Sequence, residues 1–321
     1  MRVLVTGASG MLGGAVARLL AERDDDVVLM QRRPSGLDLP ERLGDLRDPD
    51  ALRSAVRGMD GVVHLAAKVD VVGAWADYVA ANVEGTRTLL DAARHAGVGR
   101  LVQVSSPSVA YAGRSLVAAP AGPADPASAR GSYSRSKAMA ELLALAAHGP
   151  AFAVIAVRPH LVWGSGDHQL VARIVERGRS RRLALVGRGA ALIDTTYVDN
   201  AADAVVAALD VAESAGGEAY VVSNGEPRPV AEILASICAA AGVPGPRFAV
   251  PFPVAWAAGT AVDSLWSWRG SESDPPITRF LAEQLATAHW FDQRHTRHAL
   301  HWSPRVTLEE GFARLASATQ A

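Results

Sequence analysis

The stretch Arg-Val-Leu-Val-Thr-Gly-Ala-Ser-Gly-Met-Leu-Gly, residues 2–13, decides the fold of this chain. Its first five residues are mostly apolar and β-branched, which is typical of a buried parallel strand. Glycines follow at intervals of three, and apolar residues then recur at helical spacing, at Leu12, Val16, Leu19 and Leu20. This order suits a dinucleotide, because glycines let the backbone approach a pyrophosphate that the helix start attracts. We therefore expect cofactor contacts at Gly7, Ser9, Gly10, Met11, Leu12 and Gly13.

Strand-like and helix-like segments alternate through the first half of the chain. Further strands are expected near residues 27–30, 62–66, 101–105 and 152–157. Such alternation predicts an α/β fold, a Rossmann-type doubly wound parallel sheet, with a smaller, mixed C-terminal substrate lobe. We expect a dinucleotide-binding domain over 1–160 and a substrate-binding lobe over 161–321, interrupted by segments near 194–223 that return to the sheet. A length of 321 residues fits two units, since one core seldom exceeds roughly 250 to 300 residues.

Bulk composition argues against several classes of protein. The net charge of −1 gives no reason to expect a nucleic-acid partner. Cys238 is the single cysteine and lies in an apolar helical stretch, which favours packing over reactivity. Met1 leads directly into the first strand, which leaves no room for a signal peptide, and no apolar run is long enough to span a membrane. We expect a cytoplasmic protein.

Tyr133 and Lys137 stand four residues apart, in a chain whose other lysine is Lys68. Residues four apart share a helix face, so the ammonium would lie beside the phenol and lower the pKa of the phenol. Such a tyrosine can pass a proton to or from a carbonyl oxygen near neutral pH. The alternative is an exposed helical pair without a chemical role.

Together with the glycine turn, these residues make the chain resemble the extended short-chain dehydrogenase/reductases over nearly its whole length. The segment Val104–Val109 is similar to the one that supplies the serine of that family. The resemblance places the serine role on Ser106, with Ser105 as the alternative. It implies that Tyr133 exchanges the proton, that the serine holds the carbonyl oxygen, and that Lys137 also binds the nicotinamide ribose.

The resemblance also extends to the remaining cofactor contacts. Gly44-Asp45-Leu46 resembles the turn after the third strand that contacts adenine, and His64–Ala67 resembles the fourth strand, which ends under the cofactor ribose. Asn82–Thr86 is similar to the opening of the long helix that follows. The resemblance thus implies contacts at Asp45, Leu46, Ala66, Ala67, Lys68 and Pro159. For Lys68, contact with the cofactor and no contact are equally expected.

The choice of nicotinamide cofactor depends on the end of the second strand. An NAD enzyme usually places a carboxylate there for the ribose 2′-hydroxyl, whereas an NADP enzyme carries a basic residue for the extra phosphate. This chain has Gln31-Arg32-Arg33, with no carboxylate to repel a phosphate, and Arg32 could bind it in a bidentate way. We expect a preference for NADP(H), with NAD(H) as the alternative.

Later segments narrow the family. Arg158–Asp167 and Thr196–Ala202 resemble segments of 3β-hydroxysteroid dehydrogenases and sterol 4α-carboxylate 3-dehydrogenases. Val222–Pro227, Thr278–Leu285 and His289–Phe291 are more similar to the bacterial 2-alkyl-3-oxoalkanoate reductases of olefin biosynthesis. The resemblance implies reversible NADPH-dependent reduction of the 3-keto group of a hydrophobic 2-alkyl-3-oxo acid, or action on a 3-hydroxysteroid-like compound. A sugar-nucleotide epimerase or dehydratase, or a non-catalytic NADP-sensing protein, remains the alternative.

A run of aromatic and aliphatic residues over 250–268 favours a hydrophobic small-molecule substrate. It could line an acyl pocket, make peripheral membrane contact, or pack as the core of a small lobe. A homodimer is expected only from the resemblance. The arginine cluster between Arg177 and Arg182 could meet an acidic partner, but a solvated helix end fits it better. His295, His298 and His301 recur without an accompanying cysteine, and we expect no metal.

Overall fold

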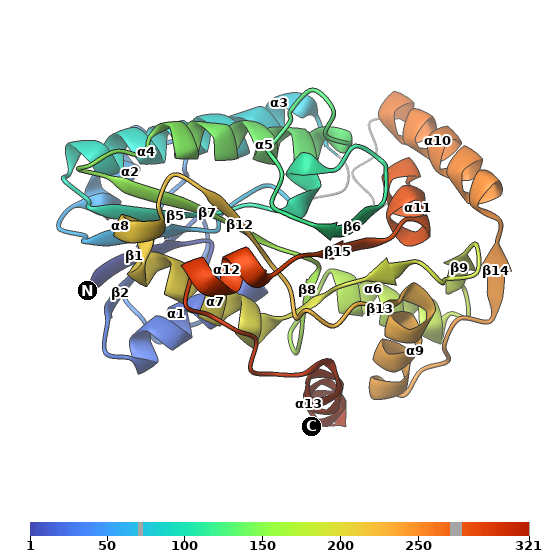
Figure 1. The fold of residues 1–321 in the computed structure, drawn as a ribbon. Coiled ribbons are helices and arrows are strands. Elements are labelled where there is room, and N and C mark those ends of the chain that lie inside the picture. Colours follow the sequence, from blue (N-terminus) through green and yellow to red (C-terminus); the bar gives the residue numbers. More distant parts are fainter. Residues whose placement is uncertain (70–72, 270–277, 321) are drawn as a thin grey trace.

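The computed structural model describes residues 1–69, 73–269 and 278–320. Within them, seven parallel strands form one sheet in the order β12-β7-β5-β4-β1-β2-β3 (Figure 1). The strands are β1 (Arg2–Thr6), β2 (Asp26–Gln31), β3 (Glu41–Leu43), β4 (Gly61–His64), β5 (Arg100–Val104), β7 (Ala153–Pro159) and β12 (Ala219–Val222). The strands expected from the sequence are all present. The strands that follow β1, namely β2 and β3, are added on one side of it, whereas β4, β5, β7 and β12 are added on the other side. The strand order therefore reverses between β1 and β4, and in such sheets a ligand binds at this point of reversal.

Helices cover both faces of this sheet, which confirms the doubly wound fold (Figure 1). On one face lie α1 (Met11–Glu22) and α7 (Val198–Asp210); on the other lie α2 (Pro49–Val56), α4 (Gly85–His95) and α5 (Gly131–Ala146). Successive strand residues point to opposite faces. Val3 and Val5 accordingly pack with α1 and α7, whereas Leu4 packs with α2 and α4. The glycine turn follows β1 directly and therefore lies at the carboxyl edge of the sheet.

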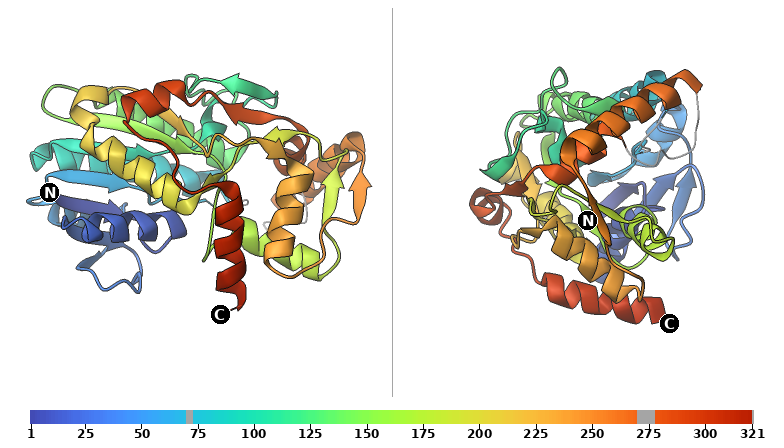
Figure 2. Two further views of the ribbon diagram at one scale, coloured as in Figure 1. Left: turned by 60° about the horizontal axis from the view of Figure 1, so that its bottom comes forward. Right: turned by 90° about the vertical axis from the view of Figure 1, so that its right-hand side faces the viewer.

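The second lobe, seen from two further sides in Figure 2, is built around a smaller sheet. The strand order of this sheet is β13-β10-β15-β6. Its strands are β6 (Leu116–Ala119), β10 (Leu192–Ile193), β13 (Arg228–Pro229) and β15 (His289–Phe291). Two further pairs join β8 (Val162–Trp163) to β11 (Thr196–Tyr197) and β9 (Ala184–Val186) to β14 (Phe248–Val250). Residues 115–132 are rich in Ala, Pro, Gly and Ser and have no apolar period, and β6 forms there because it pairs with the distant β15. The division of the chain at 160 and 161 stays a prediction, although α7 and β12 come from the returning segment 194–223.

The remaining helices complete this lobe and the connections. They are α3 (Trp75–Tyr78), the π-turn η1 (Val79–Glu84), the 3-10 turn η2 (Pro107–Ala110), α6 (Leu170–Arg179), α8 (Ala212–Ala215), α9 (Val230–Ala240), α10 (Phe252–Arg269), α11 (Arg279–Ala286), α12 (Arg294–Ala299) and α13 (Leu308–Gln320). In the part of the chain that the structure describes, every helix is too short or too polar to cross a bilayer. On α10, Phe252, Val254 and Leu265 are exposed, and the side chain of Trp268 lies outside the described residues.

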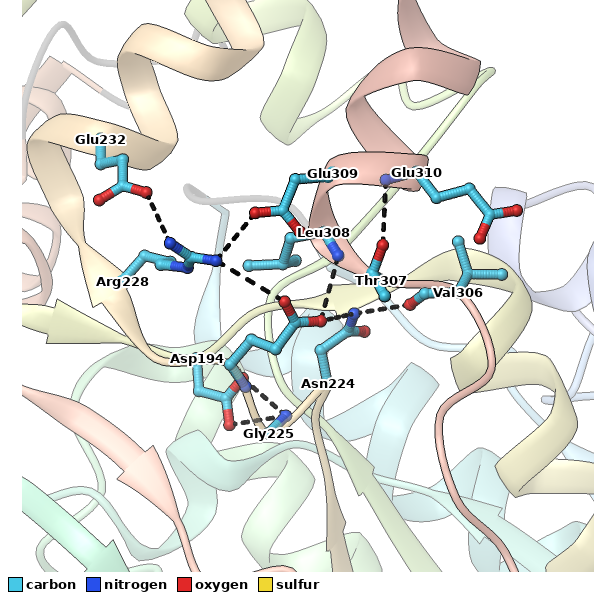
Figure 3. A network of polar contacts seen from close by, with 11 residues as sticks. Asp194, Asn224, Gly225, Arg228, Glu232, Val306, Thr307, Leu308, Glu309 and Glu310 are labelled. Carbon is cyan, nitrogen blue, oxygen red and sulfur yellow. Dashed lines mark hydrogen bonds and ion pairs between the residues drawn. The ribbon is translucent and has the colours of Figure 1, made fainter.

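A polar network ties the last helix to the end of β12 (Figure 3). Asn224 donates from Nδ2 to the carbonyl oxygen of Val306 at 2.9 Å, and Glu226 accepts from the Leu308 amide at 3.1 Å. Asp194 is fully buried beneath this turn and accepts from the amide of Gly225 at 3.0 Å. The start of α13 is therefore held against the carboxyl edge of the main sheet.

Candidate active site

The glycine turn between β1 and α1 is shaped by close backbone contacts. Gly7 has a φ of +79°, and an added Cβ would lie 2.7 Å from the amide nitrogen of Ala66. A Cβ on Gly13 would lie 2.3 Å from the carbonyl oxygen of Gly7. Gly10 precedes α1, and no side chain caps this helix. The uncapped amides of its first turn suit the phosphates of a dinucleotide, so the residues present fit the cofactor that the sequence implies.

A hydrogen-bonded chain links this turn to the end of β2. The amide of Ser9 donates to Oε1 of Gln31 at 2.9 Å, and Gln31 donates from Nε2 to Oε1 of Glu41 at 3.0 Å. The amide of Ser35 also donates to this oxygen, at 2.9 Å. Residues 31–33 carry no carboxylate, but the parallel pairing of β2 with β3 brings Glu41 beside them. Glu41 could not be predicted from the sequence, because the pattern of one strand does not reveal which strand pairs with it.

The residues predicted to contact adenine lie together. Arg47 donates from Nη2 to Asp45 at 2.8 Å and lowers the pKa of that carboxyl. Arg32 is exposed and close enough to Asp45 for its charge to lower the same pKa. Leu46 packs against the backbone of Gly85, at the start of α4. The end of β2 and the turn after β3 therefore face one another at the edge of the sheet.

The other predicted contacts lie along the carboxyl edge. Met11 and Leu12 are half-buried against the core of the second lobe. Ala67 is half-buried after β4, and Pro159 is the buried last residue of β7. The main chain of Lys68 is held by Asn82, and its Nζ lies 5.4 Å from the ring centre of Tyr78.

A chain of buried hydrogen bonds runs beneath the switch point. Ala66 donates from its amide to Oγ1 of Thr6 at 3.2 Å, and Thr6 contacts Nδ1 of His64 at 2.7 Å. On the other side, Nε2 of His64 lies 3.1 Å from Oγ1 of Thr86, which donates to the carbonyl oxygen of Asn82. The hydroxyl hydrogen of Thr86 is donated to that carbonyl, so Oγ1 of Thr86 can only accept from His64. His64 therefore carries its proton on Nε2. Burial lowers the pKa of His64 to about 3, so it serves as a neutral link.

Asn82 is a further residue whose role the sequence did not reveal. It is 2% exposed and lies in the π-turn η1. Its Nδ2 donates to the carbonyl oxygen of Lys68 at 3.0 Å and to Oγ of Ser136 at 2.9 Å. It thereby connects the segment after β4 to the helix that carries Tyr133. The stretch that contains it was noted as a helix opening, but no local pattern indicates the π-turn that aims its side chain.

The structure brings Tyr133 and Ser106 together. Burial raises the pKa of Tyr133 to about 12, and a hydrogen bond with Ser106 acts in the opposite direction. Ser106 caps η2, and its Oγ accepts from the amide of Ser108 at 3.3 Å and from the Ser108 hydroxyl at 3.0 Å. Oγ of Ser105 is buried, with no hydrogen-bond partner among the described residues. Of the two serines, Ser106 is the one whose hydroxyl acts on the pKa of the phenol.

Lys137 lies on the same helix but does not act on the phenol as the sequence led us to expect. The side chain is buried, and its Nζ donates to the carbonyl oxygen of Val104 at 2.6 Å. Burial lowers the pKa of Lys137 to about 8, against the opposing charge of Glu141. The expected lowering of the Tyr133 pKa by Lys137 is not seen. Burial of the phenol raises this pKa, and the group that acts against the rise is Ser106.

The family model described as the NAD dependent epimerase/dehydratase family matches residues 3–223, which include the glycine turn, Ser106, Tyr133 and Lys137. The chain belongs to this family. Its membership agrees with the extended dehydrogenase/reductase resemblance that the sequence suggested.

Relatives across this epimerase/dehydratase family cover the full chain. A 2-alkyl-3-oxoalkanoate reductase of Stenotrophomonas maltophilia is 40% identical over 100% of both chains. A 3-beta-hydroxysteroid dehydrogenase of Mycolicibacterium neoaurum is 28% identical over 97% of this chain and 89% of its own. Among solved structures, MoeE5 in complex with UDP-glucose and NAD has a TM-score of 0.75 at 25% identity, covering 100% of this chain and 99% of its own. The protein is therefore an NAD(P)-dependent oxidoreductase.

The histidines noted in the sequence make other contacts. Nε2 of His295 lies 2.9 Å from Glu218, and its ring stacks on Tyr220 at 5.4 Å. Across residues 1–69, 73–269 and 278–320, no group of three or more histidine, cysteine or acidic side chains is arranged to hold a metal.

Proposed function

We propose that this protein reduces the 3-keto group of hydrophobic 2-alkyl-3-oxo acids with NADPH, forming a secondary alcohol in a reversible reaction. The observation that carries the proposal is the full-length 40% identity to a 2-alkyl-3-oxoalkanoate reductase. The closeness of the Tyr133 phenol to the Ser106 hydroxyl supports it, because a reductase needs both groups at one oxygen.

Tyr133 would act as the general acid. A pKa of about 12 keeps the phenol protonated at neutral pH, which is the form that donates to a keto oxygen. The nicotinamide, when bound, supplies the hydride for the carbonyl carbon. The phenolate left behind regains its proton from solvent before the next turnover.

Ser106 would hold the keto oxygen in line. Its Oγ already accepts from Ser108, so its own hydroxyl hydrogen remains to be donated. A ketone placed between the two side chains would receive one hydrogen bond from each, which polarises the carbonyl and fixes its orientation.

Lys137 would position the cofactor ribose and contribute a positive charge near the reacting carbonyl. With a pKa of about 8, the ammonium is still charged at neutral pH. Its present contact, the carbonyl oxygen of Val104, leaves two of its three N–H donors for other acceptors.

The preference for NADP(H) is part of the same proposal. Arg32 is exposed beside the turn that carries Asp45, where the ribose 2′-phosphate would lie. Glu41 brings a carboxylate to the same region, but its Oε1 is engaged by Gln31 and Ser35. An engaged carboxylate repels a phosphate less directly than one turned toward the site, so Arg32 decides the preference.

The test is to follow NADPH consumption by the purified protein with three sets of substrates: long-chain 2-alkyl-3-keto acids, 3-ketosteroids and keto-sugar nucleotides. Selective turnover of the keto acids is the expected result. Selective turnover of the sugar nucleotides, or their isomerisation without net NADPH consumption, would instead favour an epimerase or dehydratase.

A further inference from the structure

Charged side chains from both lobes meet beside the start of α5. Arg130 is the residue that precedes this helix, three residues before Tyr133 in the chain. Its Nε lies 3.9 Å from Oε2 of Glu283, on α11 of the second lobe. The other oxygen of Glu283 accepts from Nε of Arg279 at 2.9 Å and from the indole of Trp256 at 3.3 Å. Glu283 is thus held in place through its Oε1, and its Oε2 faces Arg130.

The contact between Arg130 and Glu283 leaves one polar atom of each side chain without a hydrogen bond. Nε of Arg130 and Oε2 of Glu283 are both buried, and neither has a hydrogen-bond partner among the described residues. A separation of 3.9 Å gives an ionic attraction but is too long for a hydrogen bond. Buried polar groups are normally satisfied, so Glu283 holds the guanidinium of Arg130 less completely than a hydrogen-bonded ion pair would.

Arg130 also lies against the segment that follows Ser106. Its Nη2 is 3.1 Å and its Nε 3.3 Å from the position that a Cβ on Gly113 would take, and the backbone there has a φ of +81°. Nearby, the hydroxyl of Tyr111 lies 2.9 Å from Oγ1 of Thr287, at the end of α11. The guanidinium therefore stands where the tyrosine helix, the serine segment and the second lobe converge.

We propose that Arg130 binds the carboxylate of the substrate and so selects 2-alkyl-3-oxo acids over neutral ketones. This inference rests on the proposed function. In such an acid the carboxylate is separated from the keto carbon by a single carbon atom, so a cation that recognises it must lie close to the proton donor. Arg130 is the residue before α5, three positions ahead of Tyr133 in the chain, and its guanidinium lies against Gly113, in the segment that follows Ser106.

The exposure of Arg130 suits the role. Its side chain is 41% exposed, while its Nε is buried, so the outer part of the guanidinium can receive a ligand. Arginine binds a carboxylate through two parallel hydrogen bonds, which gives orientation as well as attraction. Glu283, held by Arg279 and Trp256, keeps the inner edge in place without satisfying it.

The competing explanation is that Arg130 and Glu283 only tie the two lobes together. We distinguish the two with Arg130→Gln, assayed on a 2-alkyl-3-keto acid and on its methyl ester. For Arg130→Gln we expect kcat/KM to fall by about 30-fold on the acid and by less than about 3-fold on the ester. An equal loss on both substrates would support the structural tie and overturn the proposal.

Two further variants sharpen this comparison. Arg135→Gln makes the same change of charge on the same helix, but Arg135 is exposed and packs over Trp75 at 4.8 Å, so the ratio of acid to ester should stay as in the wild type. Glu283→Gln removes the charge that competes for Arg130 and should keep or increase the preference for the acid. A loss of that preference in Glu283→Gln would contradict the inference. Thermal melting of each variant checks that it is folded.

A binding measurement separates this inference from the proposed function. Tryptophan fluorescence follows the binding of 2-hexyldecanoate, its amide and UDP-glucose to wild type and Arg130→Gln. Tighter binding of the carboxylate than of the amide, lost in the variant, is expected even if no keto acid is turned over, in which case only the proposed function fails. Equal binding of acid and amide to the wild type, or dependence on Arg130 for UDP-glucose alone, would refute the carboxylate site.

Discussion

The ammonium of Lys137 lies 2.6 Å from the carbonyl oxygen of Val104, at the carboxyl end of β5. Val104 is followed closely in the chain by Ser106, and Lys137 lies one helical turn after Tyr133. This single contact therefore couples the helix that carries the phenol to the segment that carries the hydroxyl. The Ser106 hydroxyl and the Tyr133 phenol interact beside this contact.

Replacing Tyr133 by Phe tests the proposed proton donor. The ring and its packing are kept, while the hydroxyl that would donate to the keto oxygen is lost. Turnover should fall by about 10²- to 10⁴-fold, with little change in the dissociation constant of the cofactor. Steady-state kinetics and a cofactor titration measure the two effects. Full activity in Tyr133→Phe would refute the mechanism.

Ser106→Ala and Ser105→Ala form a matched pair, because the two hydroxyls are adjacent but differ in their contacts. Removing the Ser106 hydroxyl takes away the partner of Tyr133, and we expect kcat to fall by about 10- to 100-fold. Oγ of Ser105 is buried without a partner, so its removal should leave kcat nearly unchanged and should not destabilise the fold. The reverse order of effects would move the role to Ser105.

Local patterns predicted the elements of the fold but not the contacts between distant segments. The apolar run of β1 and the spacing of Tyr133 and Lys137 are properties of short stretches, so the sequence alone identified them. The approach of Glu41 to Gln31 depends on strand pairing, and β6 forms only because β15 lies beside it. Neither relationship leaves a periodic signal in its own segment.

The electrostatics of the site were harder still to predict. The distance from Tyr133 to Lys137 along a helix suggested that the ammonium would lower the pKa of the phenol. Burial instead raises that pKa, because desolvation depends on everything packed around the ring. The contacts of Asn82 were equally hard to predict, since the direction of its side chain depends on the π-turn in which it lies.

The glycine turn offers a test of the fit to a dinucleotide. A Cβ on Gly13 would lie 2.3 Å from the carbonyl oxygen of Gly7, so Gly13→Ala must distort the turn. We expect a loss of about 2 kcal/mol in the free energy of unfolding, together with weaker cofactor binding. A Cβ on Gly10 would lie 3.5 Å from the same oxygen, an ordinary contact, so Gly10→Ala should change stability by less than about 1 kcal/mol. Urea unfolding and a cofactor titration compare the two variants.

Arg32→Ala tests the cofactor preference. If Arg32 pairs with the 2′-phosphate, its loss should raise KM for NADPH by about 10- to 100-fold and leave KM for NADH within about 2-fold. Arg33→Ala, the same change at the next residue, serves as the control. A lower KM for NADH than for NADPH in the wild type, unaffected by Arg32→Ala, would contradict the NADP(H) assignment.

Asp194 should make stability depend on pH with an unusual sign. It is fully buried, and burial raises its pKa to about 6, against the hydrogen bonds from Ser223, Gly225 and Glu226. Because the folded-state pKa exceeds the unfolded value, the protonated form favours folding, and this contribution is lost as the pH rises from about 4 to about 6. A shift of two units corresponds to about 3 kcal/mol.

Asp194→Asn stays neutral at every pH and can still accept from the backbone amides, so it removes this dependence. Its free energy of unfolding relative to wild type should rise by about 2–3 kcal/mol between about pH 4 and pH 7, as measured by urea unfolding.

Asp292 serves as a control with the opposite sign, because the hydrogen bond from Arg294 lowers the pKa of Asp292 to about 2. Its contribution is present above the unfolded pKa and is lost as the pH falls through the folded one, so Asp292→Asn should lose stability relative to wild type as the pH rises. Parallel curves for wild type and Asp194→Asn would show that Asp194 does not titrate in this range.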